Sequence, residues 1–292
     1  MELLFLGTAG ATLTPRAGCA CRVCASARAL GGRRVRSGPA LYVAPGPGDA
    51  PRGGVLVDTP EEIHAALVRW GVDRVDAAFY THWHPDHTAG LRLFEHLNVD
   101  WRAPGGERPH RCTPVYLPER VARDFERWYG LMDRLRYLER RGLIEVREIA
   151  AGEVVEAAGL RLRAFPMANP ELWTYEVMED GRRAVLAVDD TRGYRPEEAL
   201  AGADVAVLET GWFEFDPEGA RIQIPGHPKA QAEASFQESL QIAARLRAGR
   251  TYFTHIEEIN QRTLEEYEAL EGSAELQAVR GRFAWDGLRV EV

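Results

Sequence analysis

Three histidines and an aspartate lie within six positions of the stretch YTHWHPDHTAG, residues 80–90. His82 and His84, two residues apart, can reach one metal ion together, while Asp86 and His87 can reach a neighbouring one. Mixed imidazole and carboxylate ligands suit zinc, manganese or iron. The alternative is a loop with incidental histidines, but this loop alone holds three of the eight histidines in the chain. The stretch therefore predicts a metal centre.

A second cluster consists of three cysteines, Cys19, Cys21 and Cys24, in the stretch GCACRVCAS. Disulfides between cysteines this close in sequence would be strained, and the N-terminal residues do not resemble a secretion signal. Three thiolates on one short loop, completed by a fourth ligand from elsewhere, are typical of a tetrahedral structural zinc site. Ordinary reduced or redox-sensitive thiols are the alternative. The remaining cysteine, Cys112, is expected to be an inert buried thiol.

Strands and helices must position these side chains. Short apolar or β-branched runs predict strands at 1–7, 40–44, 54–58, 76–81, 114–118, 161–167, 173–178, 184–189, 204–210 and 251–256. Apolar spacings of three and four residues predict helices at 60–71, 87–97, 118–142 and 229–249. Strands in both halves of the chain, with helices between them, indicate an α/β fold. We expect a four-layer α/β/β/α sandwich of two packed mixed sheets with helices on the outer faces.

Length and composition limit the alternatives. The chain has 292 residues, 45% of them hydrophobic and 27% charged, with a net charge of −8. This length suits one large α/β domain over residues 1–292, with the Cys-rich metal loop at 18–26. The negative charge offers no extended surface for nucleic acid, and no apolar run approaches the roughly 20 residues that span a membrane. We expect a cytoplasmic protein with a small-molecule substrate, and a homodimer is the default assembly.

The motif H-x-H-x-D-H on a strand-to-helix turn resembles that of the metallo-β-lactamase fold superfamily. Other landmarks follow in the family's order: LFLGTAG as first strand and turn, VLVDTP with Asp58, AVDDT with Asp190, and TYFTHI with His255. Within the superfamily, the cysteine loop resembles the phosphodiesterase branch that acts on phosphoribosyl cyclic phosphate. The stretch PGHP, with His227, matches that branch's candidate catalytic histidine.

The resemblance implies two active-site metals, with zinc as the expected ion and manganese or iron not excluded. It carries the ligand set over to His82, His84, Asp86, His87, Asn169, Asp190 and His255. The last two ligands of the motif and His255 would hold one metal, its first two histidines the other, and Asp190 would bridge them. Asp189 and Asp190 could instead both be turn residues, and the sequence alone does not separate them.

Asp58 would orient a ligand histidine by hydrogen bonding. Asp86 and His227 are the candidate catalytic residues, with His227 protonating the leaving alkoxide or binding a phosphate oxygen. For His227 the alternative is a solvent-facing histidine at a helix start. Two tryptophans near the site, Trp83 and Trp212, could line a pocket or fill the core.

Two positions depart from the family's pattern. No histidine occurs between His110 and His227, where the family places another metal ligand, and Asn169 in FPMANPELW is the best-matching position. An amide oxygen is a weaker ligand for zinc than imidazole. The histidine that completes the cysteine site in the phosphodiesterase branch is replaced by Glu258, which could complete a tetrahedral zinc site or be a solvated charge.

Three functions are compatible with these residues. The first is a metal-dependent phosphodiesterase that acts on a small phosphodiester, cyclic ones included, through a metal-bound hydroxide. The second is a hydrolase of lactones, thioesters or other carboxylic esters with the same fold. The third is a non-catalytic, metal-bound binding or carrier protein related to cofactor biosynthesis.

Overall fold

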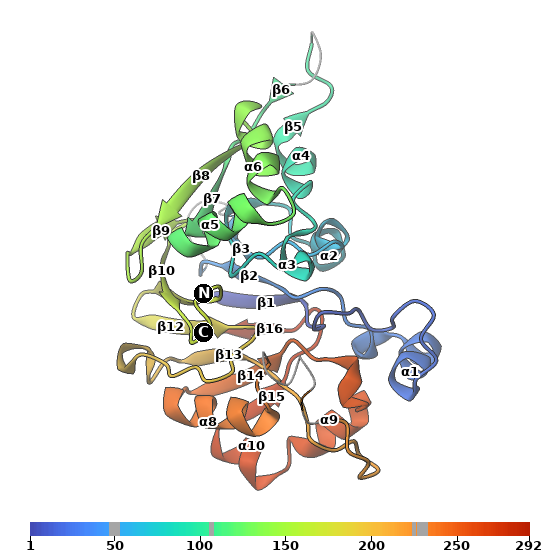
Figure 1. The fold of residues 1–292 in the computed structure, drawn as a ribbon. Coiled ribbons are helices and arrows are strands. Elements are labelled where there is room, and N and C mark those ends of the chain that lie inside the picture. Colours follow the sequence, from blue (N-terminus) through green and yellow to red (C-terminus); the bar gives the residue numbers. More distant parts are fainter. Residues whose placement is uncertain (47–52, 105–107, 224–225, 227–232) are drawn as a thin grey trace.

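The computed structural model describes residues 1–292 except 47–52, 105–107, 224–225 and 227–232. Two seven-stranded sheets pack against each other (Figure 1). The first contains, in spatial order, β16 (Arg289–Glu291), β1 (Glu2–Gly7), β2 (Ala40–Ala44), β3 (Gly54–Val57), β4 (Val75–Phe79), β7 (Thr113–Pro118) and β8 (Ile144–Ile149). The second contains β15 (Gly281–Phe283), β14 (Arg250–Thr254), β13 (Val205–Glu209), β12 (Arg182–Ala187), β11 (Trp173–Glu179), β10 (Leu160–Pro166) and β9 (Val155–Ala157). A separate short pair consists of β5 (Val99–Asp100) and β6 (Arg108–Pro109).

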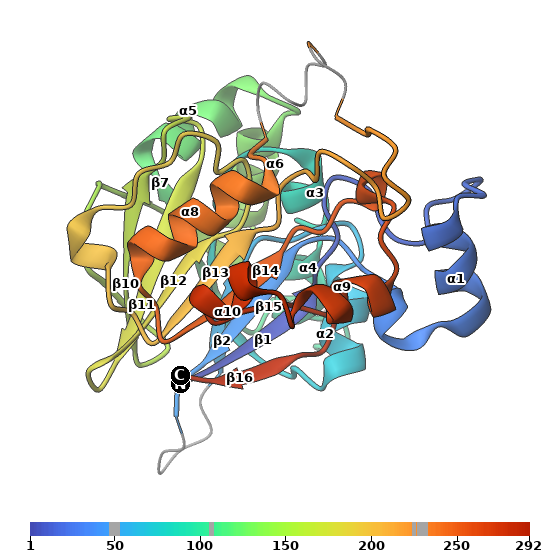
Figure 2. The ribbon, with the colours of Figure 1, turned by 90° about the horizontal axis from the view of Figure 1, so that it is seen from below.

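Helices cover the outer faces of both sheets (Figures 1 and 2). Those along the first half of the chain are α2 (Ile63–Trp70), α3 (Pro85–Thr88), α4 (Leu93–Asn98), α5 (Glu119–Arg127) and α6 (Leu131–Arg140), while α1 (Arg22–Leu30) lies at the side of the sandwich. Those along the second half are α8 (Phe236–Leu246), α9 (Leu264–Leu270) and α10 (Ala274–Ala278). Helices α5 and α6 pack on β7 and β8, while α8 packs on β13 and α10 on β15. The predicted α/β/β/α sandwich is confirmed.

Alternate residues of one strand contribute to two different hydrophobic cores. Along β12, Ala184 and Leu186 face the core between the sheets, whereas Val185 and Ala187 face the core beneath the helices of the second sheet. All four side chains are fully buried. A strand covered on both faces must be apolar at every position, which explains the uninterrupted AVLA run.

Parallel strand pairing brings distant loops together. β12, β13, β14 and β15 run parallel to one another, and β3, β4 and β7 do so in the first sheet. Carboxyl ends of parallel strands meet at the same edge of a sheet. The loops after β3, β4, β12 and β14 carry the predicted site residues, so the topology gathers them at one edge of the sandwich.

Two predicted helices are divided in the structure. The segment 118–142 forms α5 and α6, separated by Trp128, Tyr129 and Gly130, because the last two of these adopt left-handed backbone angles. The segment 87–97 forms α3 and α4. Apolar spacing continues across both breaks, so the periodicity alone could not locate them.

Other differences concern exposed parts of the chain. Strand β8 escaped prediction because it is an edge strand whose charged residues alternate with apolar ones and face solvent. Cys112 is exposed at the start of β7, so the expectation of a buried thiol was wrong. None of the helices in the described parts of the chain is long and apolar enough to cross a membrane.

The end of the histidine motif packs tightly against the loop after β3. Gly90 donates its backbone N–H to Thr59 O at 2.8 Å, and a Cβ atom at this position would lie 2.2 Å from Pro60 O. We expect Gly90→Ala to lower the free energy of unfolding by about 1–3 kcal/mol, measured by urea denaturation. Gly272→Ala is the matched control, because its Cβ would meet no atom closer than 3.5 Å. An equal effect of the two substitutions would contradict the packing explanation.

Candidate metal centre

The histidine motif begins in the turn after β4 and continues through α3. His82 and His87 are completely buried, while the His84 side chain is 34% exposed. His87 donates its backbone N–H to His84 O at 3.0 Å, which folds the motif back on itself. His255, directly after β14, reaches the same place, and its ring stacks on that of His87 with centroids 5.7 Å apart. The turn therefore presents its imidazoles toward the second sheet.

The carboxylate of Asp189, two residues after β12, lies at the centre of these imidazoles. Its oxygens are 3.1 Å from His82 Nε2, 3.4 Å from His87 Nε2 and 3.2 Å from His255 Nε2. Asp86 Oδ2 approaches His87 Nε2 at 3.6 Å and His255 Nε2 at 3.7 Å. Two ligand groups result, and they share Asp189.

These two groups fit metal ions. Asp86, His87, Asp189 and His255 form one, and His82, His84 and Asp189 form the other, with the ligand atoms of each group within 4.8 Å of one another. The Nε2 atoms of His82, His87 and His255 are buried, and none has a hydrogen-bond partner among the described residues. A buried nitrogen lone pair without a partner is costly unless it binds a cation.

Asp58 contacts His87 at Nδ1, the ring nitrogen that points away from Asp189. Its Oδ2 is 2.8 Å from His87 Nδ1 and accepts a 2.7 Å hydrogen bond from Thr81 Oγ1, while its Oδ1 accepts the Thr81 backbone N–H at 2.8 Å. A carboxylate at Nδ1 fixes the ring so that Nε2 carries the free lone pair. These contacts would allow Asp58 to orient His87, and its orienting role stays a prediction.

Electrostatics of the cluster favour a bound cation. Burial opposes charge on His255, but the Asp189 carboxylate outweighs it and raises the pKa of His255 to about 10. Asp189 is also buried, yet His255 and His82 hold its pKa well below its usual range. Burial and the neighbouring His82 lower the pKa of His84 to about 4, so this imidazole is neutral at pH 7 and free to bind a metal.

The structure corrects the predicted bridging residue. Asp189, not Asp190, faces the histidines, while the Asp190 backbone N–H donates to Asp189 Oδ1 at 2.8 Å. Asp190 has a φ of 41°, and this left-handed turn directs the two carboxylates differently. Because β12 ends at Ala187, strand alternation no longer fixes side-chain direction at either aspartate. Asp58 and His255 also have positive φ, at 64° and 53°, so backbone strain gathers at this centre.

Two other predicted site residues are not brought to the cluster by any described contact. Asn169 lies in the exposed turn between β10 and β11, where its Oδ1 accepts the Glu171 backbone N–H at 3.2 Å. Its amide is therefore used within its own turn, and metal binding by Asn169 stays a prediction. His227 lies outside the described residues, so its catalytic role also stays a prediction.

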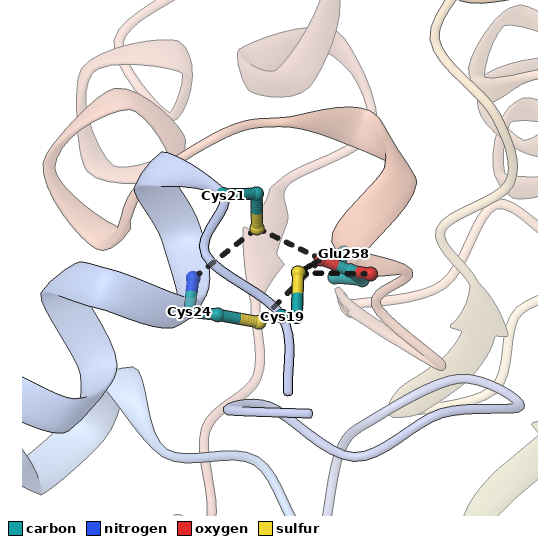
Figure 3. Close-up of side chains that lie close together, drawn as sticks. All are labelled: Cys19, Cys21, Cys24 and Glu258. Atoms are coloured by element: carbon teal, nitrogen blue, oxygen red, sulfur yellow. Dashed lines mark hydrogen bonds between the residues drawn. The ribbon is translucent and has the colours of Figure 1, made fainter. Parts of the chain in front are cut away.

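The three cysteines and Glu258 form a second cluster at the side of the sandwich, where α1 lies (Figures 2 and 3). Glu258 Oε2 is 2.9 Å from Cys21 Sγ, 3.5 Å from Cys24 Sγ and 3.6 Å from Cys19 Sγ. All four ligand atoms lie within 4.8 Å of one another. Thiolates and one carboxylate in this arrangement suit a tetrahedral metal, as the sequence predicts.

Sequence reasoning missed Arg16, which completes the surroundings of the cysteine cluster. Its Nη2 is 2.6 Å from Glu258 Oε1, so one carboxylate oxygen meets the guanidinium while the other meets the thiols. Its backbone N–H donates to Cys24 Sγ at 3.3 Å. An arginine two residues before a Cys-rich loop has no distinctive spacing, so no sequence signal identifies it.

Comparison with solved structures supports this assignment of the fold. A diphosphatase from the PhnP family is 26% identical, with a TM-score of 0.72 and coverage of 100% of this chain and 97% of that one. Zn²⁺-bound PqqB from Methylobacterium extorquens is 19% identical, with a TM-score of 0.72 over 100% of both chains. The short form of human tRNase Z is 16% identical, with a TM-score of 0.62 over 100% of this chain and 99% of that one. The last two likenesses show the fold alone.

Among curated proteins, an octanoyltransferase from Porphyromonas gingivalis is 28% identical over 141 residues. The match covers 48% of this chain but only 24% of that protein, so most of the relative has no counterpart here. The family model for the beta-lactamase superfamily domain matches residues 43–256, well over half of the chain and all of the metal centre. The chain therefore belongs to the beta-lactamase superfamily, as a metallo-β-lactamase fold protein with a structural likeness to the PhnP family.

Proposed function

We propose that the protein is a zinc-dependent phosphodiesterase that acts on a small phosphodiester. The observation that carries the proposal is the pair of ligand groups that share the Asp189 carboxylate. The likeness to a PhnP-family diphosphatase, whose name places its reaction at phosphorus, favours phosphorus over carbon as the reacting centre. When bound, a metal pair supplies an activated water and neutralises charge on the phosphoryl oxygens.

The chain's own residues prepare this chemistry. Asp86, His87, His255 and Asp189 would hold one metal, and Asp189 with His82 and His84 the other. The second group has three protein ligands, a number typical of a catalytic rather than a structural site, because it leaves a coordination position open. His84 is the most exposed of the ligands that meet here, so the substrate would approach from its side. His227 would protonate the leaving alkoxide.

The proposal predicts metal-dependent hydrolysis of bis(p-nitrophenyl) phosphate. We expect His87→Ala to lower kcat/KM by about 100-fold or more, because a ligand and its Asp58 hydrogen bond are both lost. Release of p-nitrophenolate is followed by its absorbance. Undiminished turnover in the variant would refute the metal mechanism. Turnover of p-nitrophenyl esters or lactones without phosphodiester turnover would instead favour a carboxylic ester hydrolase.

The two neighbouring aspartates offer a matched comparison. Asp189→Asn should lower kcat/KM for the same substrate by about 100-fold or more, since the shared carboxylate is removed from both ligand groups. Asp190→Asn should lower it far less, because this carboxylate does not belong to either group. Both variants are compared by kcat/KM and by bound metal per chain. The reverse order of effects would restore Asp190 as the bridging residue.

Metal content provides a test that does not depend on a substrate. Plasma mass spectrometry of protein purified without chelator should give about three metal ions per chain, one at the cysteines and two at the centre. Cys24→Ser should lose about one zinc, while Cys112→Ser, at an exposed cysteine outside the cluster, should lose none. About one metal in the unaltered protein would argue against the paired centre.

Asn169→His addresses the missing family ligand. If residue 169 can reach the metal held by His82 and His84, an imidazole there should slow the loss of one metal ion during dialysis against a chelator. An unchanged rate would mean that the exposed turn keeps residue 169 away from the centre.

A further inference from the structure

Three aromatic rings gather beside the most exposed metal ligand. Trp83, between His82 and His84, stacks on Trp128 with centroids 5.1 Å apart and on Tyr129 with centroids 5.9 Å apart. The rings of Trp83 and His84 form a T-shaped pair with centroids 4.6 Å apart. We call Trp83, Trp128 and Tyr129 the aromatic shelf. The shelf therefore begins in ring contact with a predicted metal ligand.

Polar contacts hold the Trp83 ring in one orientation. Its indole Nε1 donates to Glu171 Oε2 at 3.0 Å. Glu171 in turn accepts a 3.2 Å hydrogen bond from Arg120 Nη2, and Arg120 Nε donates to the buried Asp124 at 2.9 Å. A ring fixed in this way binds a flat partner with little loss of side-chain entropy.

The break between α5 and α6 brings the other two rings to Trp83. Helix α5 ends at Arg127, and Tyr129 then adopts a φ of 52° before Gly130. A left-handed backbone is unfavourable for a bulky residue and is normally offset by burial or function. Burial does not offset it here, because Tyr129 is 69% exposed. The unfavourable backbone conformation of Tyr129 therefore presents an aromatic face to solvent.

A positive charge accompanies the shelf. The Arg127 guanidinium lies 5.0 Å from the centre of the Trp128 ring. Aromatic faces with an adjacent arginine are suited to flat rings that carry a phosphate, because stacking and charge attraction act on one ligand. Nucleotides are such ligands, and each of the common bases can stack on an aromatic side chain.

We propose that the aromatic shelf binds the nucleobase of a nucleoside-bearing phosphodiester while its phosphate lies at the metal centre. This inference rests on the proposed phosphodiesterase function and names its substrate class. Tyr129 supplies the exposed stacking face, Trp83 links the shelf to His84, and Arg127 attracts the anion. These are specificity-determining residues and take no part in bond breaking.

The test compares two ligands that differ only by the base, adenosine 5′-monophosphate and ribose 5-phosphate. Isothermal titration calorimetry of the protein as purified, with its bound metal, measures both dissociation constants. We expect the nucleotide to bind about tenfold more tightly. In Tyr129→Ala and in Trp128→Leu the ratio of the two constants should fall toward one, whereas Tyr129→Phe should retain it.

Tyr137→Ala is the matched control, since Tyr137 is a 48% exposed tyrosine on α6 with no described ring contact to the shelf. It should keep the full ratio. Equal binding of the two ligands by the unaltered protein, binding of neither, or an unchanged ratio in Tyr129→Ala would overturn the shelf. If the unaltered protein does not hydrolyse bis(p-nitrophenyl) phosphate, but the ratio of dissociation constants still depends on Tyr129, the enzymatic proposal is overturned and the shelf stands.

Discussion

The burial of one carboxylate among three imidazoles is the constraint on which the arrangement depends. Asp189 is 4% exposed, and its neighbours His82, His87 and His255 are equally secluded. Removing an ionised carboxylate from water is expensive unless cations or hydrogen bonds surround it. The sandwich meets this requirement by ending two parallel-strand regions, one in each sheet, at the same edge. Both hydrophobic cores reach this point, since Val188 belongs to one and Ile256 to the other. The register of the strands therefore decides whether the charges meet.

Strain at the strand ends follows from the same constraint. Asp58 and His255 would continue straight along their strands if their backbones stayed extended. Positive φ angles turn both side chains inward, toward the centre. Such angles are unfavourable for residues other than glycine, so the surrounding structure must hold them. The backbone N–H of Thr81 and the carboxylate of Asp58 provide part of that support by hydrogen bonding to each other.

Sequence patterns predicted what is contiguous and missed what depends on tertiary geometry. The histidine motif and the cysteine loop each place several ligands within a few residues, so spacing alone indicated metal sites. The choice between Asp189 and Asp190 depends on how the chain turns after β12, which no local pattern encodes. Apolar periodicity continues through Trp128–Gly130, and only the left-handed angles of Tyr129 and Gly130 reveal the helix break there. Arg16 could not be predicted from a local pattern either, because its partner Glu258 is distant in sequence.

One turn joins the two clusters. His255 and Glu258 stand three residues apart, the first in the metal centre and the second among the cysteines. Between them, the Ile256 backbone N–H donates to Thr8 O at 2.8 Å, and Ile256 O accepts the Gly10 N–H at 3.3 Å. This turn is therefore anchored to the loop after β1 on one side and to the cysteine loop on the other. The position of His255 in the metal centre and that of Glu258 among the cysteines are therefore fixed by the same short turn.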